Sequence, residues 1–371
     1  MMTDTTLAHT AVTGPNSSVN KTQEEKLFAE AILAKKMPTY RQAYSDRTAW
    51  LMSCAAELAY VKFNPLLPNK KLQATFNKKV DEYLNGKKKK LLTALLGSFS
   101  YDAKDQEKIL TSDLNTIRLK LINTFDVADT QAFIAVTDQF AVLSFRGTES
   151  TSPKDIKSDF KAMQVKCASG GMVHSGFSEA FDVVSEQVQT ALNATDIAAK
   201  PLFITGHSLG GALATIAAKR LTHKSGIAGC YTFGSPRVGN TNWVAGLRTP
   251  VYRIVNAVDV VTMMPPGGEM IELTSKLLSH IPLLQPASDW LQKKFGGYLH
   301  SGDMRYLTNC KNGDFEKVKL LSSVSWIYRI MGMVKNNFSA SKTLKDHSMV
   351  NYRTKLSIIA RKRNLDEQSM Y

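Results

Sequence analysis

A serine stands between two glycines in the segment FITGHSLGGALATIAAKR, residues 203–220. Gly206, Ser208 and Gly210 match the pattern G-x-S-x-G, which places a serine on a sharp turn between a strand and a helix. An apolar strand-like run precedes the pattern here, and a helix-like run of small residues follows it. The glycines leave room for the turn, and the helix N-terminus offers the backbone N–H of Leu209 to a developing negative charge. We therefore predict that Ser208 is a nucleophile.

A serine hydroxyl becomes reactive when a histidine accepts its proton and a carboxylate orients that histidine. In chains with this turn, the acid and the histidine follow the serine. Asp259 ends the β-rich run VYRIVNAVDVV, where its carboxylate would emerge beside Ser208. His280, His300 and His347 come after it, and spacing alone does not choose among them.

The elements that would position these residues alternate between helix and strand patterns from about residue 117. QAFIAVTDQFAVLSFRG predicts two strands joined by a hairpin-like turn, and later strand patterns are separated by helix patterns. Such alternation predicts parallel strands with crossover helices. Residues 25–115 are predicted to be helical, and the polar residues 1–24 to form a disordered tail. We therefore expect one α/β domain over residues 116–371 with a helical N-terminal region.

The composition is that of a globular protein with a basic surface. The chain has 371 residues, of which 43% are hydrophobic and 21% charged, and its formal net charge is +15. This excess favours an anionic partner, either nucleic acid or an acidic membrane surface. No nucleic-acid recognition motif accompanies the lysines, so we expect no nucleic-acid partner. Lys87–Lys90 precede an apolar run, which favours the acidic membrane.

The cysteines and the apolar runs indicate which cofactors and which cellular compartment to expect. Four scattered cysteines have no metal-ligand spacing, so we expect reduced, buried thiols and no metal or cofactor. No apolar run approaches the ~20 residues of a membrane-spanning helix. The N-terminus shows no signal-peptide pattern, which predicts cytoplasmic synthesis followed either by peripheral membrane attachment or by export without a cleaved signal. The oligomeric state stays open.

Several separated segments together resemble the class 3 lipases, the fungal-type triacylglycerol lipase family, in a form similar to its bacterial members. The likeness covers roughly residues 117–360 and rests on VLSFRGTES, VHSGF, GHSLGGALA, YTFGSPRVGN, RIVNAVDVVTMMPP, GYLHSG and DHSMVNY. The resemblance implies an α/β-hydrolase fold with a mostly parallel sheet, a nucleophile elbow at GHSLG and added helices. These helices would lie at the N-terminus and between the catalytic acid and histidine.

The resemblance also implies a role for each matching residue. Ser208 would be the nucleophile, Asp259 the orienting acid and His347 the base. Thr148 and Leu209 would form the oxyanion site. His300 would be a structural histidine.

The segment 149–165 follows the oxyanion strand where the family carries its lid. Within it, Asp159 matches an aspartate that supports the hydroxyl of the oxyanion residue. The lid would also carry Lys154, Lys157 and Lys161, a second basic region that could face a bilayer.

Two features depart from the family. The 88 residues from Asp259 to His347 make a long span, and we expect a helical insertion at about 268–345. Leu320, Val324, Ile327, Met331 and Val334 form an apolar stripe within it, which favours burial in the core over membrane contact. The disulfides and signal peptide of secreted fungal members are also missing from the pattern, so extracellular triglyceride digestion does not follow.

The activity implied is hydrolysis of lipid carboxylic esters, from triacylglycerol or glycerophospholipid, through an acyl-enzyme. The partner would be lipid at a membrane or droplet surface, with anionic lipid favoured by the charge. Two alternatives stay open: a phospholipase-type secreted effector, and a non-catalytic lipid-binding protein on a hydrolase scaffold.

Overall fold

The computed structural model describes residues 30–35, 37–39, 43–61, 103–148, 163–280, 282–295, 297–310, 314–335 and 345–369. Three sequence predictions lie outside these residues: the tail at 1–24, the basic run Lys87–Lys90, and residues 149–162 of the expected lid, which include Asp159.

An eight-stranded sheet forms the centre of the described structure, in the order β1-β2-β3-β6-β7-β9-β11-β12. The neighbours from β3 to β11 run parallel, and β1, β2 and β12 pair antiparallel at the two edges. The bounds are β1 Lys120–Val127, β2 Thr130–Val136, β3 Ala141–Phe145, β6 Leu202–His207, β7 Ile227–Phe233, β9 Val251–Asn256, β11 Asp303–Leu307 and β12 Leu320–Leu321. The expected mostly parallel sheet and the hairpin between β2 and β3 are confirmed.

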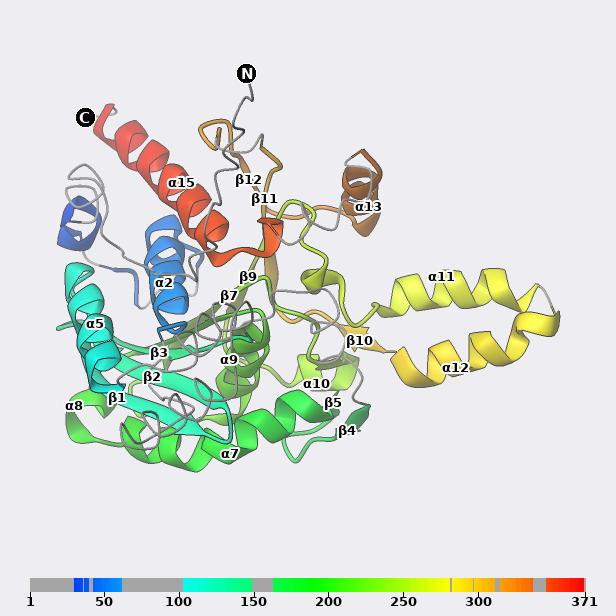
Figure 1. Ribbon diagram of the computed structural model, residues 1–371, viewed down its shortest axis with the longest axis horizontal. Helices are drawn as coiled ribbons and strands as arrows, with labels where there is room; N and C mark the ends of the chain where they lie inside the picture. Colours follow the sequence, from blue (N-terminus) through cyan, green and yellow to red (C-terminus); the bar gives the residue numbers. More distant parts are fainter. Residues whose placement is uncertain are drawn as a thin grey trace, which may run out of the picture.

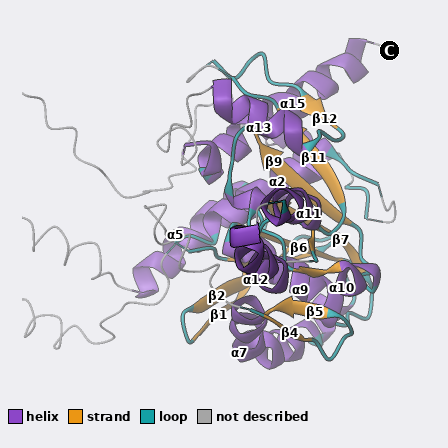
Figure 2. Cartoon of the chain, turned by 90° about the vertical axis from the view of Figure 1, so that its right-hand side faces the viewer, coloured by secondary structure: helices purple, strands orange, loops and turns teal. Residues whose placement is uncertain are grey.

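Alternation along the strands supplies two apolar faces, each covered by helices. On β9, Tyr252 and Ile254 belong to a core shared with α2 (Asp46–Leu58) and α15 (Met349–Ser369). On β3, Ala141 and Leu143 belong to a second core with α7 (Ser175–Leu192) and α9 (Leu209–Arg220). Figure 1 shows α2 and α15 on one side of the strands and α7 on the other, and Figure 2 shows α15 and α7 on opposite sides of the sheet.

The remaining elements lie around this centre. A second sheet of four short strands has the order β10-β8-β5-β4. Its strands are β4 Gln164–Lys166, β5 Met172–His174, β8 Gly239–Asn240 and β10 Tyr298–Leu299, and the helices not yet named are α5 Ala103–Thr116, α8 Thr195–Ala198, α10 Thr241–Ala245, α11 Gly268–Ser279, α12 Gln285–Phe295 and α13 Trp326–Lys335. Two 3-10 turns lie at Val261–Met263 and Pro282–Leu284, and short helical stretches lie at residues 30–34 and 345–347. Among the described helices, none is long and apolar enough to cross a membrane.

Helix α2 is part of the α/β domain, although the sequence places it in a separate helical region. Its backbone carbonyl groups accept hydrogen bonds from two buried strand side chains: Ser144 Oγ donates to Ala55 O over 3.0 Å, and Thr205 Oγ1 to Met52 O over 3.2 Å. Nearly every side chain of α2 is buried. The division at residue 115 therefore does not separate two cores, because α2 covers one face of the central sheet.

The span from 268 to 345 is not uniformly helical, which corrects the expected insertion. Helices α11 and α12 form a hairpin that projects from the body in Figure 1, and α13 lies nearer the sheet. Between α12 and α13, however, the chain forms β10, β11 and β12. β11 pairs parallel with β9 inside the central sheet. Its five residues, DMRYL, are too few for a period to identify them as a strand.

The apolar stripe on α13 faces solvent, so the expectation of a core stripe is wrong for this helix. Ile327, Met331 and Val334 are each more than half exposed, at 53%, 54% and 53%. The charged Arg329 is the residue that points inward, only 3% exposed, and its Nη2 donates to the backbone carbonyl of Asp259 over 2.9 Å. The spacing of the apolar residues predicts that they face the core. In the structure, α13 instead turns Arg329 inward, where its guanidinium group is hydrogen-bonded.

A buried ion pair ties α2 to α15 and provides a test of this packing. Arg353 Nε donates to Glu57 Oε2, and both side chains are about nine-tenths buried. Glu57→Ala would leave the guanidinium buried without its carboxylate, so we expect the free energy of unfolding, measured by urea titration, to fall by about 3–5 kcal/mol.

The control for this prediction is Asp105→Ala in α5. Asp105 forms an exposed pair with Lys108, and its removal should change the unfolding free energy by less than about 1 kcal/mol. Equal small losses in both variants would show that α2 is not fixed to the domain through Glu57.

Candidate functional site

The turn after β6 holds Ser208 in a backbone conformation that few residues adopt. Its φ is 57° and its ψ is −126°, and α9 begins at the next residue. Two close backbone approaches surround it: a Cβ on Gly206 would lie 2.2 Å from Gly210 O, and a Cβ on Gly210 would lie 2.3 Å from Phe145 O. Only glycine fits at both positions, so the two glycines of the motif permit the strained serine between them.

A continuous hydrogen-bonded chain joins three buried side chains from distant parts of the sequence. Ser208 Oγ lies 2.9 Å from His347 Nε2, and His347 Nδ1 lies 2.9 Å from Asp259 Oδ2. The exposed fractions are 5% for Ser208, 8% for His347 and 0% for Asp259. With Nδ1–H donating to the carboxylate, Nε2 is the acceptor for the serine hydroxyl proton. The arrangement can therefore remove that proton.

Asp259 is held as a carboxylate by its neighbours. The backbone N–H of Val261 donates to its Oδ1 over 3.0 Å, and the Tyr352 hydroxyl donates to its Oδ2 over 2.6 Å. Burial by itself raises the pKa of Asp259, but His347 and the hydrogen bonds from His347 and Tyr352 outweigh burial and hold that pKa below its ordinary value. Asp259 can thus orient His347 without taking up a proton near neutral pH.

Tyr352 connects the acid to the strand that carries it. Its hydroxyl accepts a hydrogen bond of 3.0 Å from the backbone N–H of Asn256, the last residue of β9, while it donates to Asp259. Burial and the adjacent carboxylate raise the pKa of Tyr352 well above its ordinary value, so it stays a donor. The segment DHSMVNY contains this residue, but nothing in its spacing reveals the contact.

A second histidine fixes the backbone of His347. His207 Nε2 lies 2.7 Å from the carbonyl oxygen of His347, and its Nδ1 lies 2.7 Å from the Tyr60 hydroxyl. A carbonyl only accepts, so Nε2 carries the proton and Nδ1 accepts from Tyr60. Burial, assisted by the nearby His347, lowers the pKa of His207 to about 3. Tyr60 lies 147 residues before His207, and no sequence signal joins them.

Of the predicted oxyanion residues, Leu209 follows Ser208 directly, and Thr148 follows a glycine whose backbone lies close to Ser208. Leu209 is the first residue of α9, whose N-terminus carries the positive end of the helix dipole. Thr148 follows Gly147, where a Cβ would lie only 3.2 Å from the Ser208 Cβ. The backbone leading to Thr148 therefore passes against the serine, but the oxyanion role of both residues stays a prediction.

The other two candidate histidines face elsewhere. His280, at the end of α11, is exposed, and its ring contacts the carbonyl oxygen of Lys276. His300 Nε2 lies 2.7 Å from the carbonyl oxygen of Thr262, in the turn that follows Asp259. Of the three, His347 is the one whose ring is hydrogen-bonded to Ser208.

Within the residues that the structure describes, no three His, Cys, Asp or Glu side chains are grouped as metal ligands. All four cysteines are free thiols; two are buried and two partly exposed.

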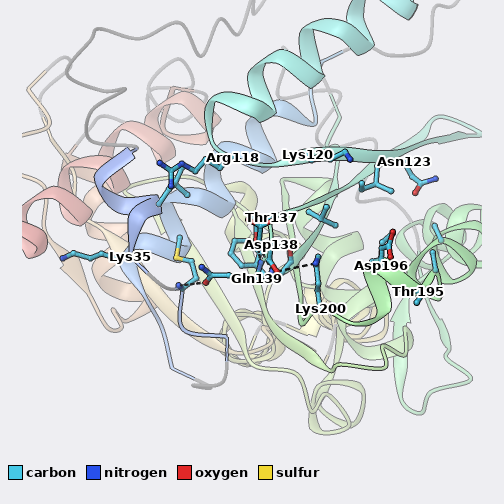
Figure 3. Close-up of a pocket in the computed structure, with 18 residues that line it drawn as sticks. Lys35, Arg118, Lys120, Asn123, Thr137, Asp138, Gln139, Thr195, Asp196 and Lys200 are labelled. Atoms are coloured by element: carbon cyan, nitrogen blue, oxygen red, sulfur yellow. Dashed lines mark hydrogen bonds between the residues drawn. The ribbon is translucent and has the colours of Figure 1, made fainter.

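A cavity of about 850 Å³ lies at the opposite end of the central strands. Its wall includes the turn at 137–139 between β2 and β3 and Lys200, which precedes β6. Figure 3 shows Lys200 beside Asp138, whose carbonyl oxygen accepts a hydrogen bond of 3.4 Å from Lys200 Nζ. Because β6 begins near this cavity and reaches Ser208 at its other end, the cavity is remote from the hydrogen-bonded chain.

The sequence around the site is similar to a known protein family and to several characterised proteins. Residues 142–269 match the family model described as Lipase (class 3). The chain is 38% identical over 133 residues to the secreted mono- and diacylglycerol lipase 1 of Fusarium solani, which covers 34% of this chain and 39% of that protein. It is 33% identical over 164 residues to a lipase of Rhizomucor miehei, covering 40% of this chain and 45% of that protein. A chloroplastic phospholipase A(1) of Arabidopsis thaliana is 38% identical over 111 residues, which are 26% of this chain and 25% of that protein.

These matches cover less than half of each of the three relatives. The solved structure of the Rhizomucor miehei triacylglyceride lipase aligns with 66% of this chain and 85% of its own, at 26% identity and a TM-score of 0.45. The expected likeness to bacterial members finds no support, because these relatives are fungal and plant proteins.

The protonation of His207 gives a test of the site's geometry. An unfolded histidine ring takes up a proton below about pH 6.5, whereas the folded His207 ring stays neutral until about pH 3. Protonation of the unfolded chain therefore lowers stability as the pH falls from 6.5 towards 3. In ¹⁵N-histidine NMR spectra, we expect His207 to keep the signals of a neutral Nε2–H ring between pH 8 and pH 5.

His207→Gln identifies the resonance by its loss, and a short histidine peptide gives the reference titration. A His207 signal that titrates together with the peptide would contradict the buried, neutral tautomer.

Proposed function

We propose that this chain hydrolyses carboxylic esters of lipids through an acyl-enzyme on Ser208, because residues 142–269 match the family model described as Lipase (class 3). The observation that carries the proposal is the hydrogen-bonded chain from Ser208 through His347 to Asp259. Relatives named as lipases and as a phospholipase A(1) support a lipid ester, from triacylglycerol or glycerophospholipid, as the substrate class.

The proposed mechanism uses each group in the state that its surroundings favour. His347 Nε2 accepts the Ser208 proton as Oγ attacks the ester carbonyl carbon, and Asp259 stabilises the imidazolium that forms. The backbone N–H groups of Leu209 and Thr148 bind the oxyanion. His347 then donates the proton to the leaving alcohol. Water, deprotonated by the same ring, releases the fatty acid and restores the serine.

Catalysis is favoured over lipid binding alone by the charge on Asp259. A non-catalytic scaffold has no need of a buried carboxylate, which is costly to desolvate. Here that carboxylate is hydrogen-bonded to the ring that faces Ser208, which is the arrangement that proton transfer requires. The rival function, a lipid-binding protein on a hydrolase scaffold, would bind the same esters without turnover.

Substitution of the two proton-transfer partners tests the proposal. Ser208→Ala and His347→Ala should each lower kcat for a short-chain nitrophenyl ester by roughly 10⁶-fold, and the double variant should lose no more, because the two residues act as one unit. His300→Ala should instead lower the melting temperature and keep activity in the folded fraction, since it removes the contact with Thr262 O.

The matched control is His280→Ala, which removes an exposed histidine. A Ser208→Ala enzyme with a tenth of the wild-type rate would rule out the proposed nucleophile. If replacing His300 abolished activity while replacing His347 left it intact, His300 and not His347 would be the general base.

We also propose that the enzyme works at an anionic lipid surface. The support is the formal net charge of +15, which attracts acidic lipid headgroups, each nearby lysine contributing about 1 kcal/mol. The two basic segments that suggest the contact, Lys87–Lys90 and the lysines of 149–162, lie outside the described residues.

Salt dependence tests this surface proposal. Exposed charges are screened over about 8 Å at physiological ionic strength, so hydrolysis of vesicles containing phosphatidylglycerol should fall as NaCl is raised tenfold. Vesicles of phosphatidylcholine alone are the control. Equal rates on both kinds of vesicle at both salt concentrations would contradict electrostatic attraction of the enzyme to anionic lipid.

A further inference from the structure

Arginine side chains gather behind the turn that carries Asp259. Arg329 Nη2, from α13, donates to Asp259 O over 2.9 Å and also reaches Thr262 Oγ1. Arg237 Nη1 donates to Pro265 O over 2.6 Å. Arg253, on β9, is close enough to both guanidinium groups for them to lower its pKa. Positive charge is therefore concentrated on one side of this turn.

Arg253 lies inside the sheet, and neither of the residues directly opposite it on the adjoining strands is acidic. Its cross-strand partners are Thr232 on β7 and Met304 on β11, neither of which carries a negative charge. Two positions further along the same face, Tyr306 packs against Tyr328 of α13 with ring centroids 5.9 Å apart. Helix α13, and with it Arg329, therefore covers the face of the sheet on which Arg253 lies.

Several buried donors in this region lack a hydrogen-bond partner within the described part of the chain. They are Arg253 Nε and Nη1, Arg329 Nε and Thr232 Oγ1. The exposed fractions of Arg253 and Arg329 are 7% and 3%, and that of Thr232 is 1%. Buried polar groups are nearly always satisfied in native proteins, so a group of unsatisfied donors indicates a bound acceptor.

The charge balance indicates that this acceptor is an anion. Burial, with added repulsion from Arg329 and Arg237, lowers the pKa of Arg253 to about 9, which still leaves it protonated at pH 7. Asp259 already accepts hydrogen bonds from Val261, His347 and Tyr352. Buried charges in proteins are stable when they are paired, and this carboxylate is committed elsewhere.

We propose that Arg253 and Arg329 bind a small inorganic anion of the halide class, with the hydroxyl group of Thr232, the cross-strand partner of Arg253, as an additional donor. A cavity of about 400 Å³, lined by Arg237, Tyr298, His300 and Trp326 among others, adjoins the arginine group at Arg237. The anion joins β9 to α13 and so holds Arg329 against the Asp259 carbonyl. This site is distinct from the ester-binding site and does not depend on the proposed activity.

Thermal unfolding in sodium chloride tests the proposal on the whole chain. A ligand that binds the folded state raises the melting temperature in a saturable way. At constant ionic strength, replacing sodium gluconate by about 300 mM sodium chloride should raise the melting temperature by roughly 3 °C. Gluconate is the control because it is too large for a halide-sized site.

Arg253→Met is the informative variant, because methionine is similar in length and already occupies the neighbouring position 304. It should fold and lose the halide-dependent rise. The matched control Arg248→Met removes an exposed arginine and should keep the rise. An equal response to chloride and gluconate, or an unchanged chloride response in Arg253→Met, would overturn the proposal.

Bromide gives a direct readout that needs no variant. Crystals of the wild-type protein soaked in sodium bromide should show an anomalous-scattering peak within hydrogen-bonding distance of the Arg253 guanidinium. Ordered bromide at surface positions alone, with none at Arg253, would contradict the site.

Discussion

The buried carboxylate of Asp259 has to stay ionised inside the protein while it faces a histidine that will become positively charged. Isolated burial would neutralise it, and the structure prevents this with hydrogen bonds from Val261, His347 and Tyr352. These donors come from the turn after β9 and from the C-terminal segment, which packs against α2 through Arg353 and Glu57. The geometry at Ser208 thus depends on elements from both ends of the described chain.

A hydrogen bond to the backbone of the same residue, Asp259, accompanies the orientation of α13, whose apolar residues face solvent. The carbonyl group of Asp259 accepts from Arg329, and this buried polar bond requires the charged side of the helix to face the sheet. The strained turn at Ser208 is supported in a similar way, by glycines whose missing side chains permit close backbone contacts. At α13, the preference of apolar residues for burial is not met, and Arg329 is buried with a hydrogen bond to Asp259. At Ser208, the serine adopts an unfavourable backbone conformation, and close backbone contacts at Gly206 and Gly210 surround it.

Local sequence patterns were sufficient for Ser208, Asp259 and the parallel strands that lead to them, because an apolar strand followed by a turn is a short-range signal. Spacing does not distinguish His347 from His280 and His300, because a contact between residues 139 positions apart produces no local sequence pattern, and only the family resemblance singles it out. The contact of Tyr60 with His207 was missed for the same reason. β11 was missed because its neighbour in the sheet, β9, lies almost fifty residues earlier, and strand pairing over that distance follows from tertiary packing.

In the proposed mechanism, His347 activates the Ser208 hydroxyl as a nucleophile. An alkyl fluorophosphonate tests it directly, because attack by an activated serine on phosphorus releases fluoride and leaves a stable phosphonyl ester on that serine. Peptide mass spectrometry should find the adduct on Ser208, and His347→Ala should slow its formation by at least about 10³-fold. An adduct on a different serine, or labelling of Ser208 at the same rate without His347, would contradict the account.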